Sequence, residues 1–278
     1  MKYGIRQKSL PLPDEKLFIE AQHLGFDGVE LNTEPDYSTD RLWRHGEAER
    51  LKKFARATGI EVHTISLSAI RDYGFLNTDS EKRKVGQQLI KHLSEAGSQM
   101  GATVIMLPII STTHKDVASP LLVDGLQEAA KTAEDNGIYL ALEVFLSADD
   151  VLDIIQRVNS EYVKVCFDVG ITTVCGYDVY VEMVKLKKMM VQIHMKDSVR
   201  PKELGEGHIE FPDLKMVRDQ IGWEKWGKQL GEGSVNFASV RKAIRHINYD
   251  GYLILETPPD DDPLGNAARN LKFVQELI

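Results

Sequence analysis

The sequence predicts a closed (β/α)₈ barrel, because strand-like and helix-like segments alternate along all 278 residues. We count eight strand–helix units, and repeated units of this kind form a parallel sheet that closes into a barrel at eight strands. Strand runs such as ATVIMLPI are apolar on both faces, as expected for barrel strands covered by helices. An open doubly wound sheet is the alternative, and the absence of a GxGxxG turn after the first strand disfavours it.

The first four units occupy the N-terminal half of the chain. Their strands are expected in KYGIRQ, FDGVELN (26–32), EVHTISLS (61–68) and ATVIMLPI (102–109), and their helices at about 13–24, 46–58, 80–100 and 119–136. Glycine can adopt the left-handed conformation that stops a helix. Such a stop follows each of these helices, at Gly25, Gly59, Gly101 and Gly137.

The last four units follow the same rhythm. Their strands are expected in IYLALEVF, YVKVCFDVG, VQIHMKDS and GYLILETPP, and their helices at about 147–158, 178–188, 237–247 and 265–277. No domain boundary is evident, so residues 1–278 are predicted to form a single domain. One segment, at about 198–230, interrupts the rhythm and is predicted to be an enlarged loop. It contains Trp223 and Trp226, and its LGEGHIEF is echoed by LGEGSVNF.

Composition and charge exclude several classes of protein. The chain is 42% hydrophobic and 27% charged, as in ordinary globular proteins, and its net charge is −8. An acidic chain is a poor non-specific binder of nucleic acid. No apolar run approaches the roughly 20 residues that span a bilayer, and the N-terminus does not read as a secretory signal. Cys166 and Cys175 do not suggest a disulfide framework, so we expect reduced thiols and a cytoplasmic location.

Each of the last four strands carries one side chain that can bind a metal, near its C-terminal end. These side chains are Glu143, Asp168, His194 and Glu256. A charged group inside an apolar strand is costly to bury unless something pairs with it. In a barrel, the C-terminal strand ends form the catalytic face, so the four side chains are predicted to converge on one divalent cation. An oxygen-rich set suits Mn²⁺, which we expect, with Mg²⁺, Co²⁺ or Zn²⁺ as alternatives.

Two of these residues also suit proton transfer. A cation that holds a carbonyl and a neighbouring hydroxyl acidifies the C–H bond between them. One carboxylate can then remove that proton and a second can return it from the opposite face. Glu143 and Glu256 are predicted to act in this way. The outcome would be epimerisation beside a ketone, or aldose–ketose isomerisation if the proton returns to the neighbouring carbon.

The chain resembles the sugar isomerase/epimerase superfamily of xylose-isomerase-like TIM barrels. The resemblance is carried by FDGVEL, LSAIRDYG, LALEVF, CFDVG, IHMKDSVR, LGEGSVNF and YLILET. It is strongest to the ketose-phosphate 3-epimerases of the L-ribulose-5-phosphate or L-xylulose-5-phosphate type. The resemblance implies a divalent cation on the four residues above, with Glu143 and Glu256 as the acid/base pair. It also implies a small sugar or sugar phosphate as partner and a homo-oligomer.

Further substrate-binding residues follow from the same resemblance. Arg200 matches a substrate-contacting arginine, and its alternative is a solvated arginine of the loop. Lys196 and Asp197 belong to the His-x-Lys-Asp motif, whose alternative role is an ion pair that shapes the loop. Glu30 could reach a substrate hydroxyl or orient a ligand. The set is completed by two residues just past the third strand, Ser68 and Arg71. The glycines of the second LGEG, Gly231 and Gly233, could approach a phosphate or simply form a tight turn.

One departure limits the resemblance. Many relatives have a histidine three residues after the aspartate, where this chain has Ile171. Endonuclease IV, in the same superfamily, needs that histidine and others, so DNA repair is disfavoured. Two alternatives remain: a metal-dependent lyase of the inosose dehydratase type, and a non-catalytic sugar-binding barrel. The sequence leaves open which sugar is used, whether it is phosphorylated, and the oligomeric state.

Overall fold

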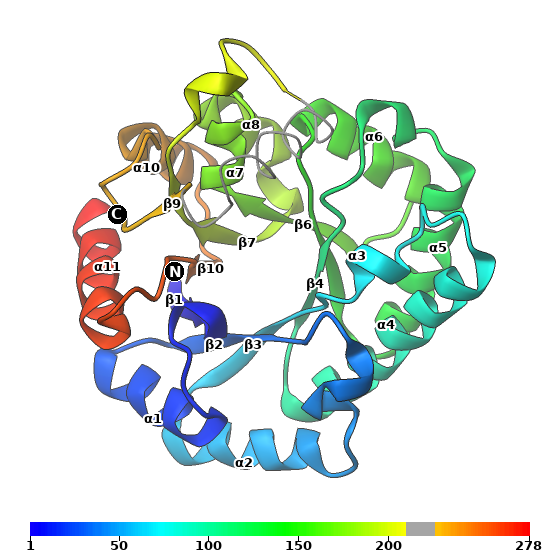
Figure 1. The fold of residues 1–278 in the computed structure, drawn as a ribbon, viewed down its shortest axis with the longest axis horizontal. Coiled ribbons are helices and arrows are strands. Elements are labelled where there is room, and N and C mark those ends of the chain that lie inside the picture. The colour runs from blue at the N-terminus through cyan, green and yellow to red at the C-terminus, as the bar shows by residue number, and fades with distance from the viewer. Residues whose placement is uncertain (210–225) are drawn as a thin grey trace.

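Eight parallel strands close into the predicted barrel, in the order β1-β10-β7-β6-β5-β4-β3-β2 (Figure 1). The computed structural model describes residues 1–209 and 226–278. All eight predicted strands are present, as β1 (Lys2–Arg6), β2 (Gly28–Asn32), β3 (Glu61–Ser66), β4 (Val104–Pro108), β5 (Tyr139–Glu143), β6 (Val163–Asp168), β7 (Met190–Met195) and β10 (Tyr252–Leu255).

Helices form a ring around the strands (Figure 1). The eight predicted helices are found within about two residues of their expected bounds, as α1 (Asp14–Leu24), α2 (Glu47–Thr58), α4 (Ser80–Met100), α5 (Pro120–Asp135), α6 (Ala148–Val158), α8 (Val179–Leu186), α10 (Phe237–Ile247) and α11 (Pro263–Leu277). Two short helices were not predicted, α3 (Ile70–Tyr73) after β3 and α7 (Val169–Val174) after β6. Single 3₁₀ turns are η1 (Gln7–Ser9), η2 (Tyr37–Thr39), η3 (Arg41–Trp43), η4 (His114–Asp116), η5 (Lys187–Met189) and η6 (Lys202–Leu204).

The helix stops are mostly those that the sequence predicted. Gly25, Gly59 and Gly101 cap α1, α2 and α4 in the left-handed conformation, with φ of 90°, 72° and 88°. α5 ends one residue earlier, at Asn136, and Gly137 follows with φ of 67°. The left-handed caps of α6 and α10 are asparagines, Asn159 and Asn248, which tolerate this conformation better than most side chains do.

The core lies between the strands and the surrounding helices. Every residue of β2 and β4 is buried, as expected for strands that contact helices outside and side chains inside. A smaller apolar cluster includes Val104, Met106, Ala141 and Cys166. Cys166 and Cys175 are both buried and free, which confirms that they form no disulfide.

The enlarged loop between β7 and α10 is described only in part. Its described ends pair as a short antiparallel ribbon of β8 (Asp197–Ser198) and β9 (Gly227–Lys228). Trp226 is 3% exposed and packs with Leu204 and α7, so it packs this loop against the barrel. Trp223 lies outside the described residues. Among the helices of the described ranges, none is long and apolar enough to cross a membrane.

The packing of β3 against β10 gives a test of acid stability. His63 stacks on Tyr252 with ring centroids 3.9 Å apart, and burial lowers the pKa of His63 to about 4. Between that pKa and the unfolded value of about 6.5, the unfolded chain binds a proton that the native protein does not. The stability that His63 contributes is therefore lost as the pH falls through this window.

We expect His63→Phe, which keeps the stacked ring but cannot titrate, to lose less stability than the wild type between pH 7 and pH 5. The difference should be about 2 kcal/mol, measured by urea unfolding followed by circular dichroism. His45→Phe, at an exposed position, is the control. An unchanged pH dependence in His63→Phe would contradict the assignment.

Candidate active site

The four predicted ligands converge at the C-terminal end of the barrel. Glu143 and Asp168 are the last residues of β5 and β6, His194 is the penultimate residue of β7, and Glu256 directly follows β10. The strand register brings them to one level, because His194 pairs with Asp168 on one side and with Ile254 on the other. One ligand atom from each residue lies within 4.8 Å of the others.

The same four atoms lack hydrogen-bond partners. Glu143 Oε1, Asp168 Oδ2, His194 Nδ1 and Glu256 Oε2 are all buried and make no hydrogen bond within the described residues. These atoms face one another, because His194 Nδ1 lies 3.0 Å from Glu143 Oε1 and 2.8 Å from Glu256 Oε2. Buried polar atoms are nearly always satisfied, and one shared cation would satisfy all four. Three carboxylate oxygens and one imidazole nitrogen fit a divalent cation.

Glu30 contacts the ring nitrogen of His194 that faces away from the other candidate ligands, and so fixes the orientation of the ring. Its Oε2 atom lies 2.9 Å from His194 Nε2, and its side chain is fully buried. A carboxylate at this distance holds the imidazole proton on Nε2, which leaves Nδ1 as the free ligand atom. Glu30 does not line the cavity. The geometry therefore favours the ligand-orienting role over contact with a substrate.

Arg6, at the end of β1, is a site residue that the sequence analysis missed. Its guanidinium lies 3.1 Å from Glu30 Oε1 and 2.5 Å from Glu256 Oε1, and the residue is 6% exposed. The rule that found the ligands applies here too, since Arg6 is a charge inside a strand. Arg6 was overlooked because KYGIRQ is a polar segment, in which an arginine is expected at the solvent-facing end of the strand.

Lys196 is the second cation of the site. Its ammonium lies 2.8 Å from Glu256 Oε1 and 3.5 Å from Asp168 Oδ2. Burial by itself would raise the pKa of Glu256, but Arg6 and Lys196 hold it well below its usual range. Burial raises the pKa of Asp168 to about 6. Glu143 has no lysine or arginine partner among the described residues, so the two glutamates sit in different electrostatic environments.

The charges of the site do not balance without a cation. Within the described ranges, four carboxylates, those of Glu30 and the three acidic candidate ligands, face two basic side chains, Arg6 and Lys196. With His194 neutral, as a metal ligand must be, two negative charges are left over. A divalent ion held by a neutral His194 and the three carboxylates would compensate both charges.

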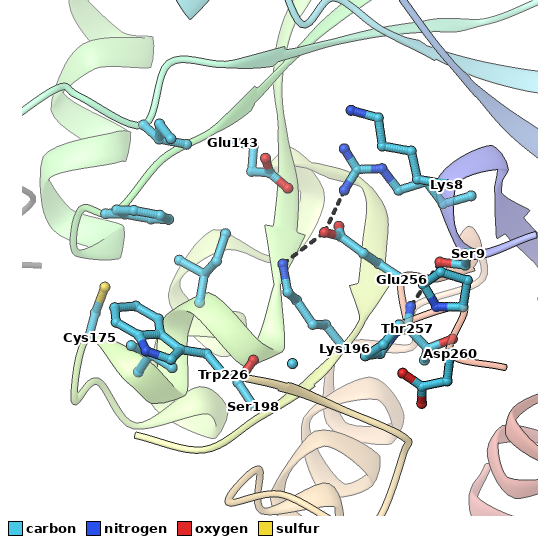
Figure 2. A pocket seen from close by; sticks show the side chains of 18 of the residues that line it. Lys8, Ser9, Glu143, Cys175, Lys196, Ser198, Trp226, Glu256, Thr257 and Asp260 are labelled. Atoms are coloured by element: carbon cyan, nitrogen blue, oxygen red, sulfur yellow. Dashed lines mark hydrogen bonds and ion pairs between the residues drawn. The ribbon is translucent and has the colours of Figure 1, made fainter. Parts of the chain in front are cut away.

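A cavity of about 670 Å³ opens above the ligands and includes Glu143, Lys196 and Glu256 in its lining. One wall is apolar and is formed by Ile110, Phe145, Ile171, Val174, Cys175 and Trp226. Figure 2 shows Trp226 and Cys175 on one side, Lys8 and Ser9 on the other, and Glu143 and Glu256 between them. The arrangement suits a ligand with an apolar carbon skeleton and polar substituents that reach the acidic and basic groups.

Some of the remaining predicted residues line the cavity and others do not. Lys196 and Arg71 line the cavity, and so does Ile171. Ser68 is buried outside it, where its backbone N–H donates to Thr33 Oγ1 at 2.9 Å. Arg200 also lies outside the cavity lining. Its guanidinium donates to the carbonyls of Val174 and Gly207, at 2.6 and 2.7 Å, and ties the loop to α7.

Asp197 holds the loop in shape through hydrogen bonds to backbone groups. It accepts hydrogen bonds from the backbone N–H groups of Gly231, Gly233 and Val235, at 2.9, 2.8 and 3.1 Å. A Cβ at Gly233 would lie 2.2 Å from Asp197 Oδ1, so only glycine permits this approach. The glycine motif is a turn closed around a buried carboxylate, which is the tight-turn alternative of the sequence analysis, and its N–H groups are not available to a phosphate.

Comparison with known proteins agrees with this geometry. The family model described as "xylose isomerase-like TIM barrel" matches residues 18–277. L-Ribulose-5-phosphate 3-epimerase UlaE of Escherichia coli is 24% identical over 267 residues, covering 87% of this chain and 93% of the relative.

Solved structures show the same fold at low identity. The D-psicose 3-epimerase of Clostridium cellulolyticum, solved with D-tagatose, has a TM-score of 0.77 at 17% identity and covers 100% of this chain and 99% of that one. The IolI protein, solved with a bound zinc atom, gives the same TM-score, identity and coverage. The 3-keto-D-glucoside 4-epimerase YcjR of E. coli has a TM-score of 0.74 at 18% identity and covers 99% of each chain.

The contact between Glu30 and His194 gives a test of the metal site. We expect Glu30→Gln to weaken Mn²⁺ binding by about 10- to 100-fold, because loss of a carboxylate behind a histidine ligand has effects of that size. Isothermal titration of the metal-free protein with Mn²⁺ measures the change. Glu128→Gln, on the outer face of α5, is the matched control. Wild-type affinity in a folded Glu30→Gln protein would refute the assignment.

Proposed function

The chain belongs to the xylose isomerase-like TIM barrel family, and from this we propose that it is a divalent-metal-dependent enzyme that epimerises or isomerises a ketose or ketose phosphate. The observation that carries the proposal is the convergence of four unsatisfied ligand atoms beneath one cavity. The relatives named as epimerases of ketoses and ketose phosphates support the substrate class.

Glu143, Asp168, His194 and Glu256 would hold one ion, for which we propose Mn²⁺. When bound, the ion would polarise a carbonyl and a neighbouring hydroxyl and so acidify the C–H bond between them. The neutral imidazole of His194 would bind through Nδ1, because Glu30 holds the proton at Nε2. Arg6 and Lys196 would keep Glu256 ionised, so that it can accept a proton at neutral pH.

Glu143 and Glu256 would carry the proton. They come from β5 and β10, which are separated by β6 and β7 in the barrel, and both line the cavity (Figure 2). A substrate carbon held between them can lose its proton to one carboxylate and regain it from the other, on the opposite face. This geometry inverts a stereocentre, which is why epimerisation is the reaction that we propose first.

The apolar wall would serve the same chemistry. Phe145, Trp226 and Ile171 shield one side of the cavity, and exclusion of water strengthens each electrostatic contact inside the site. Lys196, which lines the cavity, would donate a hydrogen bond to a substrate oxygen. We also propose a cytoplasmic location, which the two free cysteines favour because disulfides are rare in that compartment.

The acid/base assignment is tested by Glu143→Gln and Glu256→Gln. At saturating Mn²⁺, each variant is expected to lose 10²- to 10⁴-fold in kcat, the usual contribution of a general acid or base. The assay follows uptake of deuterium from solvent into a panel of ketoses and ketose phosphates. Glu128→Gln should retain full activity, and metal content is measured for every variant.

Three other outcomes have distinct meanings. Full turnover in either Gln variant would remove that residue from the mechanism. Loss of water from a cyclitol ketone, without epimerisation of any ketose, would identify a dehydratase. Absence of both bound metal and deuterium exchange would identify a non-catalytic sugar-binding barrel.

A further inference from the structure

Polar side chains form a hydrogen-bonded layer inside the barrel, one layer closer to the N-terminal ends of the strands than the candidate metal ligands. Gln192 is two residues before His194 on β7, and the register pairs it with Cys166 as it pairs His194 with Asp168. Side chains two residues apart on a strand face the same side, so Gln192 points into the barrel as His194 does. Gln192 is fully buried and does not line the cavity, so it does not reach a substrate.

The amide of Gln192 uses each of its polar groups. Its Oε1 atom accepts a hydrogen bond from the hydroxyl of Thr64, on β3 across the barrel. Its Nε2 atom lies 3.0 Å from Glu30 Oε2 and 3.2 Å from Cys166 Sγ. A primary amide has two N–H donors, so one proton goes to the carboxylate and the other to the thiol sulfur. This orientation is the stable one, because a flipped amide would place its oxygen against the carboxylate of Glu30.

Two donors therefore meet at Oε2 of Glu30. They are the amide of Gln192 at 3.0 Å and Nε2 of His194 at 2.9 Å. The other oxygen of Glu30 lies 3.1 Å from the guanidinium of Arg6. The carboxylate is thus held at both oxygens, and the amide holds the one that contacts the imidazole.

A different direction of the amide proton would close the metal site. Nε2 of Gln192 lies 3.0 Å from Nε2 of His194, so a rotated amide could donate to the imidazole. The imidazole proton would then sit on Nδ1, the atom that faces Glu143 and Glu256. A nitrogen that carries a proton has no lone pair for a cation. Thr64 opposes this rotation, because its hydroxyl holds the amide oxygen.

The packing of the barrel does not by itself require an amide at this level. Apolar side chains, Val104, Met106 and Ala141, pack with Cys166 in the same part of the interior. A buried amide costs free energy unless its groups are paired. An apolar side chain would avoid that cost, so the contacts of Gln192 with Glu30 and His194 are the reason that we assign to it.

We propose that Gln192, held by Thr64, is a positioning residue of the metal site. Its amide keeps Oε2 of Glu30 against Nε2 of His194, which leaves Nδ1 open to a divalent cation. The inference rests on the function proposed above. Because neither Gln192 nor Thr64 lines the cavity, their loss should weaken metal binding without removing a contact to a substrate.

The test is a double-mutant cycle in Mn²⁺ affinity, measured by isothermal titration of the metal-free protein. Gln192→Met should weaken binding by about tenfold, the lower end of the effect of losing an outer partner of a metal ligand. Thr64→Val replaces the hydroxyl by a methyl group and should weaken binding by about fivefold, the usual worth of one neutral hydrogen bond. In the Gln192→Met background, Thr64→Val should change the affinity no further, because Thr64 acts through the amide. Thr64→Ser should keep the wild-type affinity.

Ser94→Ala is the control for the loss of a buried hydrogen bond. Ser94 is fully buried in α4, outside the strands, and donates to the carbonyl of Ile90 at 2.8 Å. This variant should lose stability in urea and keep its Mn²⁺ affinity. Circular dichroism of each metal-free variant checks the fold. If Gln192→Met does not fold, the comparison of Thr64→Val with Thr64→Ser tests the same contact.

Several results would contradict the positioning role. They are wild-type Mn²⁺ affinity in folded Gln192→Met and Thr64→Val, additive losses in the double variant, and equal losses in Thr64→Val and Thr64→Ser. None of these measurements needs turnover. If the variants lose affinity as expected but the wild type exchanges deuterium into no ketose, the proposed reaction fails and the positioning role stands. If the wild type binds no Mn²⁺, both fail.

Discussion

The burial of uncompensated negative charge at one end of the barrel is the constraint on which the rest of the site depends. Glu30, Glu143, Asp168 and Glu256 all lie where water is largely excluded, and an isolated buried carboxylate is very costly. Arg6 and Lys196 offset part of this cost, and four ligand atoms remain unsatisfied. The fold tolerates the arrangement because a divalent ion can neutralise what the protein's own cations do not.

The need to compensate these charges accounts for the contacts of nearby residues. Arg6 bridges Glu30 and Glu256, so one guanidinium orients both a residue that positions a ligand and a ligand itself. Asp197 follows Lys196 directly but turns away from the site and closes the glycine turn of the loop. Of these two adjacent residues, Lys196 therefore lies at the cavity and Asp197 stabilises the loop. A motif match alone would have assigned both to the substrate.

The fold was largely predictable because local patterns and the final structure agree. Apolar strand runs, glycine stops and helical segments predicted all eight units, and charges inside apolar strands predicted the four side chains that the fold brings together as a possible metal site. The short helices α3 and α7 were missed, because four and six residues are too few to show a helical period. Arg6 was missed because its partners lie on β2 and after β10, and such pairings exist only once the barrel has closed. Arg200 was predicted to contact substrate, and its carbonyl partners could not be predicted because they depend on the path of a loop.

Ile171 lines the cavity at the position where the family resemblance led us to look for a histidine. The polar group nearest to consider in its stead is an ammonium. Lys196 is close to the same place. A Cβ at Gly170 would lie 2.9 Å from Lys196 Cγ, so the glycine before Ile171 is what lets the lysine run alongside α7. Burial alone would lower the pKa of Lys196, but Glu256 and Asp168 raise it above its usual value. The ammonium therefore stays protonated and acts as a donor. A raised pKa disfavours Lys196 as the base, which supports our proposal that the two carboxylates facing the cavity, Glu143 and Glu256, carry the proton.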